Sequence, residues 1–197
     1  MVDVSELRVT PENRKLKVQK AMDGQLITRK ILVIPTVLNH NVVSDIQGDV
    51  LKMVVKNRYN DIPPAVGFVS GFGLKKGAIG SSVAHDSHNI IAVGTDDHSI
   101  AEALNRIVES KGGISLIGDR NSQVLPLPVA GIMSKDDGYT VASTYESMNS
   151  AVKELGSSLI SPFMTLSFMA LLVIPELKLS DKGLFDATRF DLTGIYD

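Results

Sequence analysis

Two helical patterns set among short strand patterns constrain the fold of this chain most strongly. After Asp96, apolar residues recur at helical spacing over residues 100–108, and an aspartate is a good cap for an opening helical turn. Gly112 and its neighbouring glycine then suit a left-handed helix end. A second stripe runs through residues 141–155 and ends at Gly156. Both stripes predict helices that bury one face in a core.

Strand patterns surround these helices. Residues 114–117 and 124–127 predict two strands joined by a turn at 118–121, where Gly, Asp and Asn favour turn conformations. The first sixty residues contain further short runs rich in β-branched side chains, at 6–9, 16–18, 26–34 and 50–55. We therefore expect an α/β (α+β) fold, a layered domain with a mixed β-sheet and flanking helices, preceded by a short β-rich segment.

The sequence Asp-Ile-Pro-Pro at residues 61–64 interrupts these patterns, because consecutive prolines remove backbone donors and favour extended loops. It separates the early β-rich runs from the region in which β and α patterns alternate. We predict a boundary here, between a β-rich segment at 1–60 and an α/β domain at 61–197. A chain of 197 residues is long enough for one large or two small domains.

Composition excludes several classes of function. The net charge of −2 gives no basic surface for nucleic acid, and the absence of cysteine rules out disulfides, thiolate metal sites and a cysteine nucleophile. Residues 1–20 lack the apolar core of a signal peptide. The most apolar run, 163–175, is too short to span a membrane. We expect a soluble, cytoplasmic protein.

Histidine and carboxylate are concentrated in one short segment, His85-Asp86-Ser87-His88. If residues 78–84 and 89–93 form paired strands, this segment is their connecting loop. Three interpretations remain open: a structural loop whose Asp and Ser bond nearby backbone groups, the lining of a substrate cleft, or a metal site. The spacing matches no established metal motif, and strand geometry would send the two imidazoles to opposite faces.

The glycines that precede this loop do not form a phosphate-binding motif. Gly71, Gly73 and Gly77 have nearly dinucleotide-binding spacing, but no helical pattern follows them and no Walker lysine motif occurs. They instead suggest tight turns or close backbone approach. Lys75 and Lys76 are more typical of a solvated turn than of an anion site.

The last third of the chain predicts a short helix, followed by a strand and a turn. Pro162 is suited to the first helical position, with Ser161 as the cap. The Met- and Phe-rich residues 163–170 fit either a core or a subunit surface. Residues 173–184 predict a strand followed by a turn, and Glu176 beside them is either a cleft carboxylate or a surface residue.

Several segments in the same order resemble the C-terminal domain of bacterial adenine deaminase, of the amidohydrolase superfamily. The resemblance runs from about residue 51 to 190 and more loosely back to residue 4. Its anchors are Gly-Phe at 67–68 and Gly-Phe-Gly-Leu at 71–74, Val-Ala-His-Asp-Ser-His-Asn at 83–89, Leu-Pro-Leu-Pro at 125–128, Ser-Pro-Phe-Met-Thr-Leu-Ser-Phe at 161–168 and Ile-Pro-Glu-Leu at 174–177.

The resemblance implies an enzyme that hydrolyses adenine to hypoxanthine and ammonia in purine salvage. It also implies a divalent metal, Mn or Fe, on a (β/α)₈ barrel, where the metal activates water. That barrel's His-x-His motif is absent from this sequence, so no catalytic or metal-binding residue is carried over. We expect no such barrel in this chain, and therefore either a fragment of a longer enzyme or a shortened gene product that is inactive alone.

In the fragment interpretation, the domain packs against its own metal-binding barrel and helps to shape the adenine pocket. The candidate substrate-cleft residues are His85, Asp86, His88 and Asn89. The alternatives are a non-catalytic interaction module that forms a homo-oligomer through the segment after Ser161, and an independent metal hydrolase built on the same loop.

Overall fold

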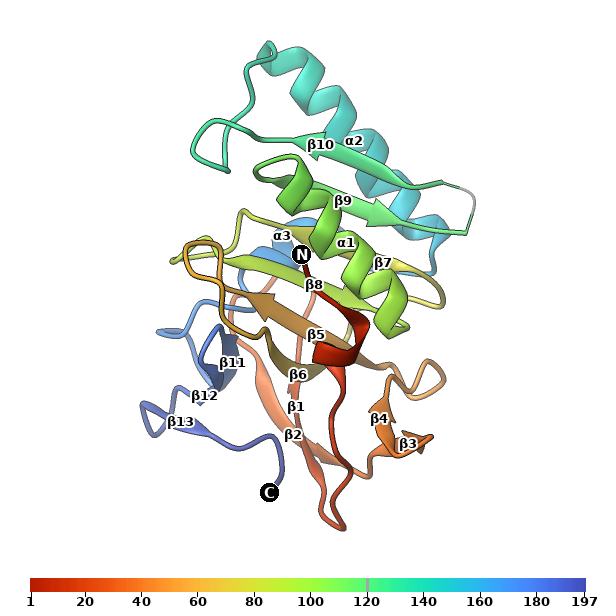
Figure 1. The fold of residues 1–197 in the computed structure, drawn as a ribbon, viewed down its shortest axis with the longest axis vertical. Coiled ribbons are helices and arrows are strands. Elements are labelled where there is room, and N and C mark those ends of the chain that lie inside the picture. The colour runs from red at the N-terminus through yellow and green to blue at the C-terminus, as the bar shows by residue number, and fades with distance from the viewer. Residues whose placement is uncertain (120) are drawn as a thin grey trace.

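A computed structural model describes residues 1–119 and 121–197 (Figure 1). Arg120, in the predicted turn at 118–121, lies outside the described residues. The helices are η1 (Val4–Leu7), α1 (Asp97–Glu109), α2 (Gly138–Glu154) and α3 (Pro162–Ser167). The strands are β1 (Leu16–Lys20), β2 (Arg29–Val33), β3 (Thr36–Leu38), β4 (Asn41–Val43), β5 (Val50–Lys56), β6 (Ala65–Ser70), β7 (Ala78–Ser81), β8 (Ile90–Gly94), β9 (Gly113–Ile117), β10 (Gln123–Pro126), β11 (Leu177–Ser180), β12 (Gly183–Asp186) and β13 (Asp191–Thr193).

An open sheet of eight strands organises the molecule, in the order β10-β9-β7-β8-β5-β6-β1-β2. Its neighbours are antiparallel except β1 and β6, which are parallel. The sheet is thus mixed, as predicted, and the described residues form no (β/α)₈ barrel. A smaller sheet, β11-β12-β13, and the β3-β4 hairpin complete the β structure. No helix in the described ranges is long and apolar enough to cross a membrane.

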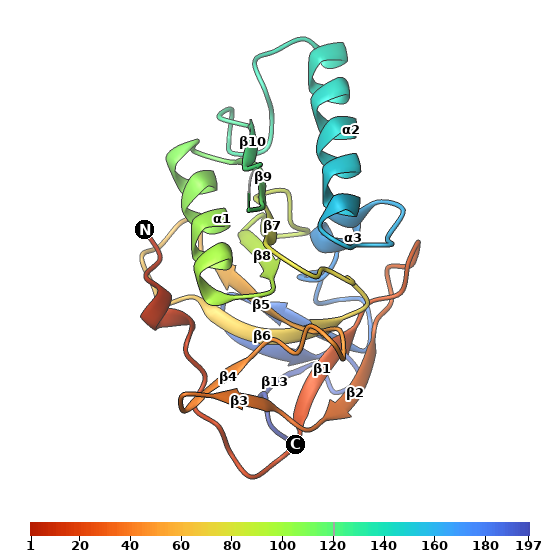
Figure 2. The same cartoon turned by 90° about the vertical axis from the view of Figure 1, so that its right-hand side faces the viewer.

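Helices cover both faces of the sheet (Figure 2). Helix α1 packs on one face, whereas α2, α3 and the small sheet lie on the other. Strands β8 and β9 are consequently buried at every position, which explains why their sequences are apolar runs rather than alternating patterns. The layered α+β prediction is confirmed.

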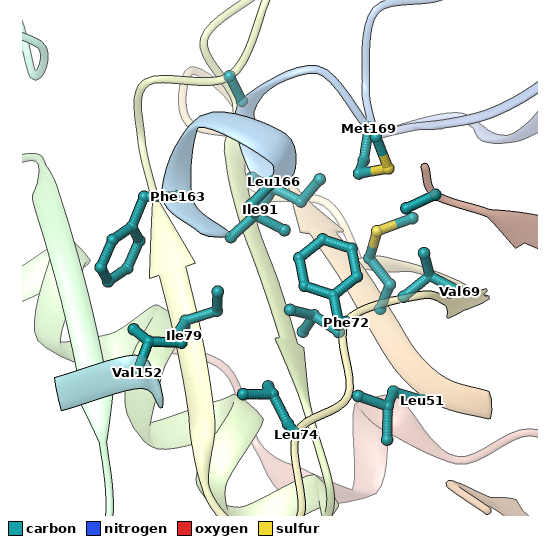
Figure 3. Close-up of a cluster of buried hydrophobic side chains, with 14 of the residues drawn as sticks. Leu51, Val69, Phe72, Leu74, Ile79, Ile91, Val152, Phe163, Leu166 and Met169 are labelled. Carbon is teal, nitrogen blue, oxygen red and sulfur yellow. The ribbon is translucent and has the colours of Figure 1, made fainter. Parts of the chain in front are cut away.

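The larger core lies between the sheet and α3. Figure 3 shows Phe72, Ile79 and Ile91 packed beneath Leu166 and Met169, all fully buried. The Met- and Phe-rich segment is therefore largely core. One side chain of that segment differs, because Met164 is 51% exposed.

Both long predicted helices form where the patterns placed them. The Asp96 side chain accepts a hydrogen bond from Ser99 N at 2.8 Å and caps α1. The chain turns left-handed one residue earlier than expected, because Lys111 already has a φ of 60° before Gly112 continues at 122°. Gly112 is needed for another reason: a Cβ there would lie 2.3 Å from the backbone of Gly131.

Two local expectations are wrong in detail. Residues 6–9 are not a strand, because a capping box between Asp3 and Glu6 starts the 3₁₀ helix η1 instead. Pro162 does open α3, but Ser161 makes no side-chain capping bond.

Strands from either side of residue 60 pair in the main sheet, and the boundary between 1–60 and 61–197 stays a prediction.

Candidate functional site

The segment His85-Asp86-Ser87-His88 forms the loop between β7 and β8, as predicted, at the left-hand end of the sheet in Figure 1. Strand β5 pairs with β8 so that Lys56 faces Ile90. This register brings the β5–β6 connection to the same end of the sheet. Sequence patterns predict neither this pairing nor the residues that it places beside the loop.

The loop is anchored at both ends. Ser82 donates its hydroxyl to the carbonyl of Gly131 at 2.6 Å, and His85 N donates to the carbonyl of Ser167 at 2.9 Å. His88 N donates to the carbonyl of Ala84 at 2.7 Å and has a left-handed φ of 51°. A non-glycine residue in that region is uncommon and often occurs at functional sites.

The two imidazoles lie close together against an aromatic ring. The His85 ring stacks on Phe168, with centroids 4.7 Å apart, and meets the His88 ring edge-on at 5.5 Å. Both imidazoles are half-buried, whereas Asp86 is exposed. The left-handed turn at His88 overcomes the strand alternation that would send the two rings to opposite faces.

His88 is held in its neutral form. Burial lowers the pKa of this imidazole, and the nearby His85 and Arg58 lower it further, while Asp86 acts in the opposite direction. A neutral imidazole has one donor and one acceptor nitrogen. Within the described part of the chain, Nδ1 of His88 is buried without a hydrogen-bond partner.

Asn89 differs from the other predicted site residues because it is only 3% exposed. Its Oδ1 accepts a hydrogen bond from Arg58 N at 3.1 Å. The structure therefore places Asn89 as a link between the β7–β8 and β5–β6 connections. Its assignment to a substrate cleft stays a prediction.

Arg58 and Tyr59 belong to the same cluster, and sequence reasoning missed both. Arg58 donates from Nη2 to the Tyr59 hydroxyl at 2.8 Å, and that hydroxyl donates to the carbonyl of Ser87 at 2.8 Å. Arg58 Nη1 also reaches the carbonyl of Ala130. The sequence shows only that an Arg-Tyr pair follows a buried strand. That pair is recognised as part of the site only when β5 is known to lie beside β8.

An apolar cavity of about 470 Å³ opens beside the loop. Asp86, Ser87, Val173 and Phe190 are among the residues that line it. Pockets of 300–1,000 Å³ that are mostly apolar with a few polar groups are typical of small-molecule sites. The arrangement can surround a flat apolar group and offer it hydrogen bonds at one edge.

The described residues do not fit a resident catalytic metal. They contain no cluster of three or more His, Cys, Asp or Glu side chains that would hold an ion. Catalytic zinc sites use three protein ligands plus water. Within the described residues, His85, Asp86 and His88 therefore do not form a three-ligand metal site.

The glycine-rich segment is not a ligand cradle either. The amides of Gly71 and Gly73 donate to the two carboxylate oxygens of Asp49, at 2.7 and 2.8 Å. A phosphate would need those amides free. Gly77 permits close backbone approach, as predicted, since a Cβ would lie 1.9 Å from the carbonyl oxygen of Ile117.

The remaining candidates lie elsewhere in the fold. His40 lies in the β3–β4 turn and His98 is exposed in the first turn of α1. Glu176 accepts a hydrogen bond from Lys30 N at 2.8 Å through its carboxylate, which ties it to strand β2. None of the three lies at the β7–β8 loop.

Comparison with known proteins gives a consistent family. Residues 25–191 match the family described as adenine deaminase C-terminal domain. A protein of Methanosarcina acetivorans named adenine deaminase is 53% identical over 99% of this chain, and one of Sulfurovum sp. with the same name is 56% identical over 86%. A third, from Methanothermobacter thermautotrophicus, is 40% identical over the whole chain.

These alignments cover only part of each relative. The chain spans 37% of the Methanosarcina acetivorans protein, 31% of the Sulfurovum protein and 36% of the Methanothermobacter thermautotrophicus protein, or about a third of each. The family match covers most of the chain and includes the β7–β8 loop, α3 and strands β11 and β12 of the small sheet. The chain therefore belongs to the adenine deaminase C-terminal domain family.

Proposed function

We propose that this chain serves as the C-terminal domain of an enzyme that hydrolyses adenine to hypoxanthine and ammonia. The observation that supports this most strongly is the family match over residues 25–191, together with relatives at 53–56% identity that carry the name adenine deaminase. Each of those relatives is about three times as long as the matched segment. The hydrolytic chemistry is assigned to the remainder of such an enzyme.

The finer parts of the proposal follow from the family resemblance. They comprise membership of the amidohydrolase superfamily, a divalent metal, Mn or Fe, held outside this chain, a place in purine salvage and a cytoplasmic location. A metal bound there would supply a water of lowered pKa as the nucleophile. The residues of this chain would bind and orient groups around that centre.

We assign the β7–β8 loop to the rim of the adenine pocket. Adenine is flat and apolar on its faces, with ring nitrogens that accept hydrogen bonds and an amino group that donates them. His85 is presented on Phe168, and the lowered pKa of His88 keeps it neutral at pH 7. The neutral imidazole of His88 offers a donor and an acceptor to such an edge, and Asp86 offers acceptors.

The experiment uses a chimera in which this chain replaces the matching third of the Methanosarcina acetivorans relative. His85→Ala removes one imidazole; His88→Asn removes the other and keeps a residue that tolerates a positive φ. Loss of one hydrogen bond that contributes about 1–1.5 kcal/mol corresponds to roughly a tenfold decrease in kcat/KM. We expect kcat/KM for adenine to fall about tenfold for each substitution.

His98→Ala is the matched control, since His98 is exposed on α1 away from the loop. It should leave kcat/KM unchanged. Unaltered kinetics for both loop variants would remove the loop from the adenine pocket. A stable dimer of the 197-residue chain, measured by light scattering, that neither binds purine nor supports the chimera would favour the alternative of a non-catalytic oligomerisation module.

A further inference from the structure

Two groups of exposed apolar side chains flank the β7–β8 loop. The first, called the hairpin patch, lies between the β1–β2 connection and α3 and consists of Leu26, Ile27, Ile160 and Met164. The second, called the cavity patch, borders the 470 Å³ cavity and consists of Val173, Phe190 and Leu192. Ile160 and Phe190 are more than 70% exposed, which is costly for side chains of this size.

Hydrogen bonds join the segments that carry the two patches. Lys178 Nζ donates to the carbonyls of Leu26 at 2.8 Å and Phe168 at 3.1 Å, which joins the hairpin patch to the ring beneath His85. Thr28 N donates to the carbonyl of Pro175 at 2.9 Å, close to Val173. The segments that carry the hairpin patch, the His85–Phe168 stack and the cavity patch are therefore neighbours, and the exposed side chains of the three are called here the α3 face.

This face has the features of an unfilled interface. A cavity of about 210 Å³ opens at the hairpin patch, in addition to the larger one at the cavity patch. Clustered apolar side chains bordered by polar residues mark interaction sites on proteins, whereas scattered ones do not. The border is acidic: Asp23, Asp86 and Asp181 line the two cavities, with Lys182 as the one cation among their lining residues in the described chain.

We propose that the α3 face docks onto the remainder of the longer enzyme polypeptide, the part outside this chain. The inference rests on the proposed function, because the relatives carry about two thirds of their length beyond the matched segment. The docked surface presents aliphatic or aromatic side chains to the two cavities and arginine or lysine opposite Asp86. Docking there seats the β7–β8 loop against the other domain.

The charges of the face disfavour a second copy as the occupant. In a two-fold dimer the same patch faces itself, so six carboxylates and only two ammonium groups, the two copies of Lys182, would share one interface. Like charges brought together at an interface cost several kcal/mol. A different surface with basic residues satisfies the acidic border, and the rest of the enzyme chain is the partner that is always present.

Methionine oxidation by hydroxyl radicals tests the docking directly. Met164 in the hairpin patch is 51% exposed, and Met133, in the loop after β10, is 52% exposed. Their rates of oxidation should be similar in the 197-residue chain. In the chimera with the Methanosarcina acetivorans relative, we expect Met164 to be protected at least fivefold and Met133 to react as before.

Adenine turnover by the same chimera reports the proposed function separately from the docking. Equal oxidation of the two methionines in an active chimera would overturn the docking proposal alone. Protection of Met164 in the isolated chain, accompanied by a dimer in light scattering, would assign the face to a second copy and likewise overturn it. Protection of Met164 without turnover would support docking and count against the proposed activity.

A pair of substitutions gives an independent measurement. Val173→Asp places a charge on the α3 face, and Ile34→Asp places one between β2 and β3; the two wild-type side chains are 61% and 82% exposed. Neither should change the melting temperature of the isolated chain by more than a few degrees. In the chimera, Val173→Asp should abolish protection of Met164, and Ile34→Asp should not. Equal effects of the two would contradict the proposal.

Discussion

The two faces of the main sheet treat a buried lysine in opposite ways. On the α1 face, Lys52 is fully buried, and its Nζ lies 2.7 Å from Asp97 Oδ1 and 2.9 Å from the carbonyl of Leu7. On the opposite side, Lys178 of strand β11 is also fully buried, but its Nζ donates to two backbone carbonyls, and burial lowers its pKa to about 8.

This difference distinguishes a side of the domain whose buried charge is paired from a side whose buried and apolar groups another surface would satisfy. The α1 face pairs its buried charge and is covered by a capped helix. The opposite side combines clustered exposed apolar side chains with an ammonium and an imidazole nitrogen that, among residues 1–119 and 121–197, have no carboxylate and no hydrogen-bond partner respectively. Isolated buried charges and exposed apolar patches both cost stability, so a domain retains them where another surface or a function requires them.

The largest expected loss of unfolding free energy comes from the core beneath α3. It tests whether this core is well packed in the isolated chain. Phe72 is fully buried in the core shown in Figure 3. Phe72→Ala should lower the free energy of unfolding by about 4 kcal/mol, because it removes an aromatic ring and leaves a cavity. Urea denaturation measures this. A loss below about 1 kcal/mol would mean that this core forms only when the partner surface is present.

Next in size is the buried ion pair on the α1 face. Asp97→Ala leaves the Lys52 ammonium buried without its carboxylate, and breaking such a pair costs about 3 kcal/mol or more. The exposed pair of Arg106 and Glu102 is the control, since Glu102→Ala should cost about 0.5 kcal/mol or less. If the two variants lost equal unfolding free energy in urea denaturation, the buried pair on the α1 face would contribute no more than an exposed one.

The lowered pKa of Lys178 predicts that the free energy of unfolding changes with pH by about 2 kcal/mol. Because burial lowers the pKa of folded Lys178 to about 8, the unfolded chain holds more protons above that pH, and stability rises toward the ordinary lysine pKa of about 10.4. Between pH 7 and pH 10, wild type should gain about 2 kcal/mol relative to Lys178→Met. A constant difference between the two proteins would show that this ammonium is paired.

The smallest effect belongs to the exposed aromatic ring of the cavity patch. Phe190 is 71% exposed, has a left-handed φ of 55° and touches Phe185 edge-on. Phe190→Asn suits that backbone and removes little buried area, so the unfolding free energy of the isolated chain should change by no more than about 0.5 kcal/mol. A much larger loss would assign the ring to this domain's own core.

The fold could be predicted where local chemistry decides the structure. Asp96 and the apolar spacing that follows define α1, and the predicted strand and turn at 173–184 are found as β11 and the turn after it, although the strand begins only at Leu177. Strand pairing could not be predicted in the same way. The register of Lys56 with Ile90 and the parallel contact of β1 with β6 depend on residues distant in sequence.

The candidate site shows the same division. The composition of residues 85–88 identified a polar loop, and the strand patterns around it predicted its position. The partners of that loop came from elsewhere: Phe168 from α3, and Arg58 with Tyr59 from the β5–β6 connection. The inward direction of Asn89 also followed from that long-range pairing, because its amide oxygen holds the backbone of Arg58.

Ammonia release from adenine by the chimera tests the central claim most directly. With this chain in place of the matching third of the Methanosarcina acetivorans relative, we predict a soluble enzyme with kcat/KM within about tenfold of the unmodified relative, and loss of turnover when the third is deleted. A folded chimera that releases no ammonia, or a deletion that keeps full activity, would contradict the assignment of this chain as a working domain of an adenine-hydrolysing enzyme.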